Sequence, residues 1–306
     1  MFYVAKRLLA LVVLLVAISI LVFMMLQLIP GSPVSALLGQ SATNPAAVAR
    51  LTQELGLNRP LPVQYWRWLD GVLHGNLGYS YQNQQPVSAL IGQNLPSTLA
   101  LAGAGLLISL VGGILLGAVA ATRRDTPADS VSMGIAMTLV ALPSFWLGLI
   151  LILVFAVALP VFPVFGGSGL RGLVLPAFTL GLGVLGITAR FVRSSLLEVM
   201  DSPHVVAARA KGLNRRTVFL KHIARNALLP VVTIIGLQIG SLLSGAVLVE
   251  MVFSRPGIGR LLVQSILNKD YATVQATVLI IAAFYAVTNL VVDLLYPVLD
   301  PRIGGA

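Results

Sequence analysis

The stretch TLALAGAGLLISLVGGILLGAVAA, residues 98–121, decides the class of this chain because it runs without a single charged residue. A helix needs about 20 mainly apolar residues to cross the hydrocarbon core of a bilayer. Five further stretches are similarly apolar, and Asp293 is their one charged residue: Leu8–Ile29, Val131–Leu159, Leu173–Ala189, Leu229–Val249 and Val274–Leu295. The sequence therefore predicts an all-α polytopic membrane protein with six transmembrane helices.

The composition of the whole chain agrees with a membrane protein. Of its 306 residues, 57% are hydrophobic and 10% are charged, and the mean hydropathy is +0.93. Soluble domains carry about 25% charged residues. The net charge of +10 would suggest nucleic-acid binding in a soluble protein. Here the basic residues gather in short segments between the apolar runs, so we expect membrane lipid and no nucleic acid as a partner.

Basic residues also predict which side of the membrane each segment faces. The segments on the side of the N-terminus carry 13 Lys and Arg residues, and those on the opposite side carry seven. Cytoplasmic segments are the ones enriched in Lys and Arg. Both termini are therefore predicted to be cytoplasmic. Residues 1–29 hold the N-terminus and first span, residues 30–97 an extracytoplasmic region, and residues 98–306 the remaining five spans.

The extracytoplasmic region, residues 30–97, is too polar to cross a membrane but has the signals of ordered helices. The pair Asn44-Pro45 suits the start of a helix, with Asn at the N-cap and Pro at the first position. Residues 62–74 are amphipathic and rich in aromatic residues, as interfacial helices are. A third short helix is expected to begin at Pro86. Together these segments predict a helical cap between the first two spans.

The second polar region is a cytoplasmic loop at residues 190–228, which holds eight of the twenty Lys and Arg residues. Simple connections need only a few residues, so a long loop usually has a function. Within it, Ser202 suits an N-cap, Pro203 suits the first helical position, and Gly212 suits the C′ position. This pattern predicts a short helix whose small residues let another surface approach closely.

A second helix is predicted directly after the first, at residues 215–228. It is basic and amphipathic, with Phe219 and Ile223 one turn apart. Pro230 is expected to mark the turn from this helix into the fifth span.

The run HVVAARAKGLNRRTVFLKHIARNALLPVV, residues 204–232, resembles the loop motif of ABC importer membrane subunits. The form is that of the dipeptide, oligopeptide and nickel permeases, and of their B-type subunit. Residues 55–81, 252–262 and 289–304 resemble the same family in the expected order. The resemblance covers nearly the whole chain and implies the type I ABC importer permease fold.

In that family the short helix docks into a groove on a cytoplasmic ATPase and couples ATP hydrolysis to pore opening. Ala207, Ala208 and Gly212 match the Ala-Ala pair and the glycine of the motif, whereas Val206 stands where the general motif has Glu. The resemblance therefore assigns ATPase coupling to one run of residues: Val205, Val206, Ala207, Ala208, Arg209, Ala210, Lys211 and Gly212.

The resemblance also implies a function and a set of partners. The chain would form half of a pore for di- or oligopeptides or related small solutes, in the inner membrane of a prokaryote; nickel complexes, metallophores and glutathione are alternative solutes. A second homologous permease, two ATPase subunits and an extracytoplasmic binding protein would complete the importer. The chain has no G-x-x-x-x-G-K-[ST] motif, so we expect it to be non-catalytic and to bind no cofactor, with ATP and Mg held by the ATPases.

Several residues inside the predicted spans are candidates for the translocation path. Three polar residues follow the fifth span: Gln238, Ser241 and Ser244. They either line the path or form hydrogen bonds between helices. Pro143 predicts a kink in the third span, beside a cavity or for packing alone. Glu250 and Asp293 lie near the ends of spans and are either water-facing or paired structural charges, or functional ones.

Two other protein classes remain open alternatives. A secondary transporter would need no ATPase, but such proteins often contain internal repeats, and none is evident. A membrane-embedded enzyme is disfavoured because the chain has no cysteine and its three histidines lack metal-pair spacing; no metal site is expected. The glycines of two patterns, G-x-G-x-x-G at 181–186 and G-x-x-x-G at 113–117, lie inside predicted spans and favour helix packing.

Overall fold

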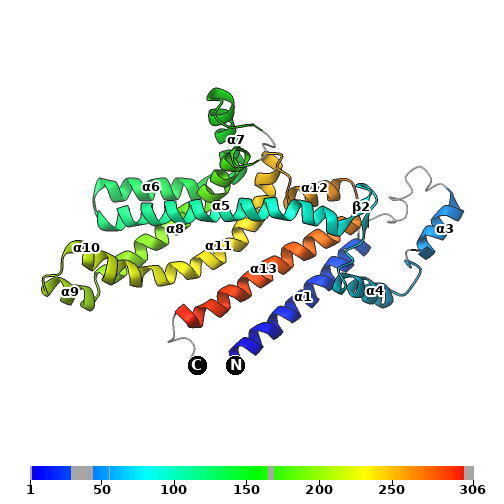
Figure 1. Ribbon diagram of the computed structural model, residues 1–306, viewed down its shortest axis with the longest axis horizontal. Coiled ribbons are helices and arrows are strands. Elements are labelled where there is room, and N and C mark those ends of the chain that lie inside the picture. Colours follow the sequence, from blue (N-terminus) through cyan, green and yellow to red (C-terminus); the bar gives the residue numbers. More distant parts are fainter. Residues whose placement is uncertain (1, 29–43, 55, 165–168, 300–306) are drawn as a thin grey trace. The chain divides into compact units, whose positions relative to one another are not determined.

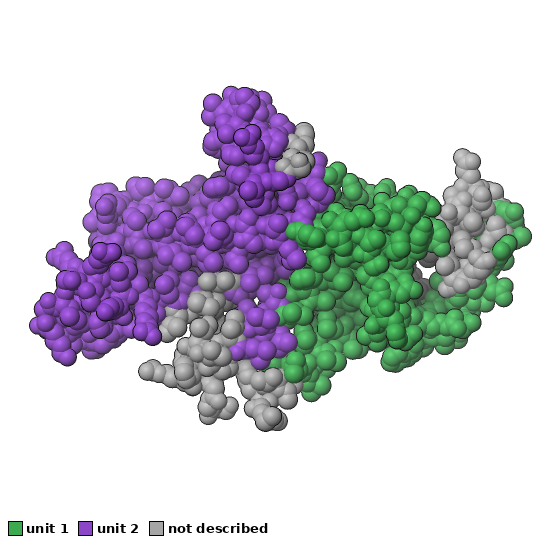
Figure 2. Space-filling model, in the orientation of Figure 1, with its two compact units in different colours: residues 1–96, 257–287 green, residues 97–256, 288–306 purple. Residues whose placement is uncertain are grey.

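The computed structural model describes residues 2–28, 44–54, 56–164 and 169–299, and these residues are mostly helical (Figure 1). They divide into two compact units (Figure 2). The first unit contains Met1–Pro96 and Gly257–Val287, and the second contains Ser97–Pro256 and Thr288–Ala306. The helices α5 (Val87–Thr122) and α13 (Tyr271–Leu299) each contribute residues to both units.

The first unit combines the N-terminal helix with most of the predicted extracytoplasmic region. Besides parts of α5 and α13, its elements are α1 (Phe2–Leu28), α3 (Pro45–Glu54), α4 (Leu61–Leu73), β1 (Tyr79–Ser80), β2 (Gln85–Pro86) and α12 (Ile258–Leu267). The two strands pair antiparallel, with Tyr79 opposite Pro86. Asn44 caps α3 as predicted, because its Oδ1 accepts a hydrogen bond from the Ala46 amide at 3.0 Å.

Aromatic side chains hold α4 against α1. The ring of Phe23 lies 5.5 Å from Tyr65 in an edge-on arrangement and 5.9 Å from Trp68. The hydroxyl groups of Ser19 and Tyr65 are 2.8 Å apart and share a hydrogen bond. The amphipathic stretch predicted at residues 62–74 therefore packs its aromatic side against the first predicted span.

The second unit contains the second to fifth predicted spans, the end of the sixth, and the loop that resembles the ATPase-docking motif. Besides parts of α5 and α13, its elements are α6 (Pro127–Ala141), α7 (Ser144–Ile152), the π-helical segment η2 (Leu153–Ala158), α8 (Arg171–Met200), α9 (Pro203–Ala210), α10 (Arg215–Thr217), the π-helical segment η3 (Val218–Ala224) and α11 (Arg225–Val252). One core cluster joins α5, α7, α8 and α11 around Leu101, Leu180 and Leu242. This cluster holds these helices together, and α9 follows directly after one of them, α8.

Glycines bring α5 and α8 into close contact. A Cβ atom on Gly117 would lie 2.5 Å from the carbonyl oxygen of Ala189, and one on Gly113 would lie 2.5 Å from Cβ of Thr188. A Cβ atom on Gly181 would likewise lie 2.6 Å from the carbonyl oxygen of Gly105. The predicted role of these glycines in helix packing is confirmed, and the contacts lie within one chain.

Four helices in the described part of the chain are long and apolar enough to cross a membrane, namely α5, α8 and the segments Lys6–Met25 and Tyr271–Val292 of α1 and α13. The helices α6 and α7–η2 make a fifth crossing if taken together, bent by 103°. The described apolar part of α11, Gln238–Val252, is shorter than a span. The all-α membrane fold is thus observed, and the number of six spans stays a prediction.

Three predicted boundaries differ from the structure. The fourth span continues as α8 to Met200, so the first part of the predicted loop is helical. The helix that begins at Val87 runs to Thr122, so no separate short helix follows Pro86. The turn predicted at Pro230 is wrong, because α11 runs through that position. In the second and third cases apolar neighbours on both sides favour a longer helix, and membrane helices tolerate an internal proline, here Pro96 and Pro230.

Candidate functional site

The short helix α9 forms where the loop chemistry predicted it. Ser202 occupies the N-cap and Pro203 the first helical position. The Ser202 hydroxyl donates to the carbonyl oxygen of Val199 at 2.5 Å and does not cap a backbone amide of α9. The start of α9 is therefore set by the fixed φ of the proline and by the extended backbone at Ser202.

The C-terminus of α9 is closed by a glycine in the left-handed region. Gly212 has φ +79°, and its amide donates to the carbonyl oxygen of Arg209 at 3.0 Å. The amide of Leu213 reaches back to the carbonyl oxygen of Ala208 at 3.4 Å. This pair of bonds is the Schellman arrangement, and it confirms the predicted role of Gly212.

The two faces of α9 have different environments. Val205 is fully buried, at 0% exposure, and Ala208 is buried as well. Both belong to a cluster that includes Ala121 from α5 and Val192 from α8. The other six residues of the predicted run are exposed: Val206, Ala207, Arg209, Ala210, Lys211 and Gly212. The inner face thus anchors α9, and the outer face presents Val206 together with small and basic residues at the surface.

The segment after α9 is helical but not a separate helix. The Asn214 side chain caps it by accepting a hydrogen bond from the Thr217 amide at 2.7 Å. Its π-helical turns, η3, place Val218 and Ile223 in the same cluster as Val205. The predicted amphipathic character is confirmed, because Val218 and Ile223 are buried while Arg215, Arg216 and Lys221 are exposed, although Leu220 is exposed as well.

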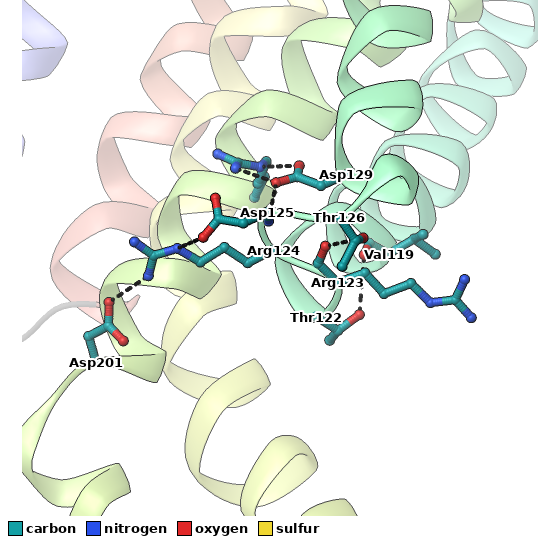
Figure 3. Close-up of polar contacts among 9 residues, drawn as sticks. Val119, Thr122, Arg123, Arg124, Asp125, Thr126, Asp129 and Asp201 are labelled. Atoms are coloured by element: carbon teal, nitrogen blue, oxygen red, sulfur yellow. Dashed lines mark hydrogen bonds and ion pairs between the residues drawn. The ribbon is translucent and has the colours of Figure 1, made fainter.

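Ion pairs secure the turn between α5 and α6 (Figure 3). Arg193 of α8 binds both carboxylate oxygens of Asp129 of α6, each at 2.7 Å. In the same turn Arg124 donates to Asp201, the C-cap residue of α8, at 3.2 Å. Sequence reasoning missed these pairs because their members are 64 and 77 positions apart. The available signal was an acidic residue, Asp129, just before an apolar span.

The candidate pore residues of α11 fall into two groups. Gln238 is buried, and its side-chain nitrogen donates to the Thr188 hydroxyl at 3.0 Å, while its oxygen lies 3.4 Å from the Ser109 hydroxyl. It therefore joins α11 to α8 and α5. Ser241 and Ser244 are exposed on the surface of this chain. Of the three, these two occupy positions open to a solute or to another subunit.

The remaining candidates lie at the start of α7, near the end of α11 and in α13. Pro143 is the exposed N-cap residue of α7, at the 103° break, so the predicted kink is present. Glu250 is fully buried and accepts a hydrogen bond from the Thr98 hydroxyl at 2.5 Å. Asp293 lies in α13, but its side chain is outside the described residues.

The charges near Glu250 include Arg255, just beyond the end of α11. Its guanidinium donates to the carbonyl oxygen of Gly172 at 3.3 Å. Burial lowers the pKa of Arg255, and the negative charge of Glu250 opposes that shift. Within the described residues, no three acidic or histidine side chains are grouped so that they could hold a metal ion.

Sequence comparison finds two family profiles that together span the chain. One is described as the binding-protein-dependent transport system inner membrane component and matches residues 113–305. The other describes the N-terminal part of such membrane components and matches residues 1–102. The chain is 40% identical over 301 residues to the glutathione transport system permease protein GsiC of Salmonella paratyphi A, and 39% identical to that of Escherichia coli K12. Each alignment covers 98% of both proteins.

Solved structures share the fold at lower sequence identity. The chain superposes on the methionine ABC transporter MetNI in an inward-facing conformation with a TM-score of 0.59 and 20% identity, covering 69% of this chain and 96% of that one. An amino acid ABC transporter with histidines gives a TM-score of 0.53 at 17% identity, covering 70% and 94%. The chain belongs to the family of binding-protein-dependent transport system inner membrane components and is a permease subunit of an ABC importer.

Proposed function

We propose that α9 is the surface through which separate ATPase subunits drive this permease. The observation that carries the proposal is the contrast between adjacent residues of α9: Val205 is fully buried, whereas Val206 is 56% exposed. A helix that is anchored on one side can transmit a displacement applied to its other side. The small side chains of Ala207 and Ala210 on the exposed side let a groove approach the backbone closely.

The proposed assembly contains partners that supply what this chain lacks. The sequence has no P-loop motif, so two ATPase subunits hold the ATP and Mg. A second, homologous permease completes the pore, and an extracytoplasmic binding protein delivers the solute. Both termini and α9 face the cytoplasm, because the basic residues favour that side by 13 to seven.

The proposed solute is a small peptide. The GsiC relatives are named for glutathione, which is itself a tripeptide, and the motif of residues 204–232 resembles that of dipeptide and oligopeptide permeases. The alignment with GsiC covers 98% of the chain, so the resemblance extends over all the helices that could line a path. Glutathione is therefore the first solute to test, with dipeptides second.

A cysteine crosslink tests the docking proposal directly, since the chain has no cysteine of its own. In the assembled importer, Ala207→Cys is expected to crosslink to a cysteine introduced in the groove of an ATPase subunit. Trp66→Cys, exposed on α4, serves as the control and should not crosslink. The same preparation in proteoliposomes should take up labelled glutathione or dipeptide only when ATP is present.

Two results would contradict the proposed function. A crosslink from Trp66→Cys but none from Ala207→Cys would show that α9 is not the docking surface. Uptake that continues in the absence of ATPase subunits would instead favour a self-contained secondary transporter.

A further inference from the structure

The ion pair between Asp129 and Arg193 joins the first turn of α6 to α8 (Figure 3). The Nε and Nη2 atoms of Arg193 each lie 2.7 Å from a different carboxylate oxygen of Asp129. The Asp129 side chain is 8% exposed and that of Arg193 is 28% exposed. A two-point contact between planar groups fixes their orientation as well as their distance. The pair therefore resists sliding of α6 along α8.

The carboxylate of Asp129 is also stabilised by its own helix and by the turn that precedes it. It lies at the third position of α6, where the helix dipole favours a negative charge. Its Oδ2 accepts a hydrogen bond from the Asp125 amide at 3.2 Å. Asp125 itself has φ +60°, so the turn that precedes α6 is tightly defined. Any force on Arg193 is thus passed to the backbone of α6.

The residues of α8 around Arg193 are in turn connected to α9. Val205 and Ala208 of α9 pack in one cluster with Val192 and Leu196 of α8, and Val192 directly precedes Arg193. Asp201, which pairs with Arg124 of the α5–α6 turn, comes immediately before the N-cap of α9. This second pair is exposed and contributes little by itself.

Helix α6 leads from this ion pair to the 103° break before α7. The other end of α6 is packed against α8 as well, because a Cβ atom on Gly186 would collide with the Ala136 carbonyl oxygen. A displacement of α9 therefore has a continuous route through α8 and the ion pair to α6, and along α6 to the break.

We propose that Asp129 and Arg193 form a strap that makes α6 move together with α8 and α9 when a partner displaces α9. They are positioning residues, and the inference rests on the proposed docking of an ATPase at α9. Without the strap, α6 is held to α8 only by helix packing such as that between Ala136 and Gly186, which fixes its position along α8 less strictly. The ATPase would then still bind and hydrolyse ATP, but less of its motion would reach the solute path.

The test compares variants of the assembled importer in proteoliposomes. Arg193→Gln leaves the buried Asp129 charge without its partner, and Asp129→Asn leaves the partly buried Arg193 charge without one. The double variant D129N/R193Q, which removes both charges, is therefore the deciding one. Arg190→Gln is the matched control, because Arg190 is an exposed residue one turn away on the same helix. The measurements are subunit co-purification, ATP hydrolysis, and solute taken up per ATP hydrolysed.

The expected result is a change in coupling without a loss of assembly. The double variant should retain its ATPase subunits and hydrolyse ATP, while uptake per ATP falls by about tenfold, within the usual range of coupling between sites. R190Q should keep the wild-type ratio.

Two outcomes would overturn the strap. One is an unchanged ratio in the assembled double variant. The other is a loss of assembly in which hydrolysis and uptake fall in proportion, since that would show a purely structural pair.

The crosslink from Ala207→Cys separates this inference from the proposed function. If that crosslink is absent in the otherwise unaltered importer, the docking proposal itself fails. If the crosslink forms equally in the double variant and the ratio is unchanged, docking stands and the strap alone is refuted.

Discussion

At the scale of single residues, the contact between α5 and α8 leaves no room for a side chain at Gly117. A Cβ atom there would lie 2.5 Å from the Ala189 carbonyl oxygen and 2.8 Å from Cβ of Val192. Because backbone cannot move aside as a flexible side chain does, Gly117→Val is expected to destabilise the protein by about 1–3 kcal/mol. The measurement is the midpoint of thermal unfolding in detergent.

The control for this substitution lies on the same helix. A Cβ atom on Gly103 would meet nothing within 4 Å, so Gly103→Val is expected to change stability by less than about 0.5 kcal/mol. Equal losses from the two substitutions would show that glycine content, and not the close approach of α8, governs the stability of α5.

At the scale of a helix, the end of α9 depends on the left-handed backbone of Gly212. Its φ of +79° is unfavourable for any residue with a Cβ atom. Gly212→Ala should therefore loosen the last turn of α9 by about 1 kcal/mol. Hydrogen exchange measured by mass spectrometry should show faster exchange of the amides of Gly212 and Leu213, which bond back to the helix.

A second glycine, Gly134, is the control that shows whether the backbone conformation of Gly212 causes the effect. Neither Gly212 nor Gly134 has an atom within 4 Å of an added Cβ, but Gly134 lies inside the helix α6 with ordinary helical geometry. In the Gly134→Ala variant the amides around residue 134 of α6 should exchange at the wild-type rate or more slowly, because alanine stabilises a helix relative to glycine. If the amides near the substituted glycine exchange faster in both variants, the positive φ of Gly212 is not the cause of the faster exchange at the end of α9.

At the scale of the whole molecule, the distribution of charge predicts the orientation in the membrane. Single cysteines are informative because the natural sequence has none. We expect Asp70→Cys, in α4, to react with a membrane-impermeant maleimide in intact cells. Arg216→Cys, in α10, should react only after the membrane is permeabilised. The physical reason is the excess of basic residues on the side of α9, 13 against seven.

The cysteine-free parent chain is the control for labelling and should remain unmodified. If Arg216→Cys were labelled in intact cells and Asp70→Cys were not, the orientation would be reversed, and α9 could not meet a cytoplasmic ATPase.

The sequence alone determined the features that consecutive residues encode. Long apolar runs required membrane-crossing helices, and Pro203 and Gly212 set the ends of α9 through their own backbone preferences. The motif around Ala207 and Ala208 was also readable without coordinates, since it depends on the order of residues.

Only the tertiary structure decided which of these residues meet. It placed Val205 inside and Val206 outside, a choice that depends on what packs beneath α9. It joined Asp129 to Arg193 across 64 positions, and it set Gln238 against Thr188. The physical reason is that helix starts and stops follow from local backbone energetics, whereas ion pairs and buried faces depend on how separate helices pack.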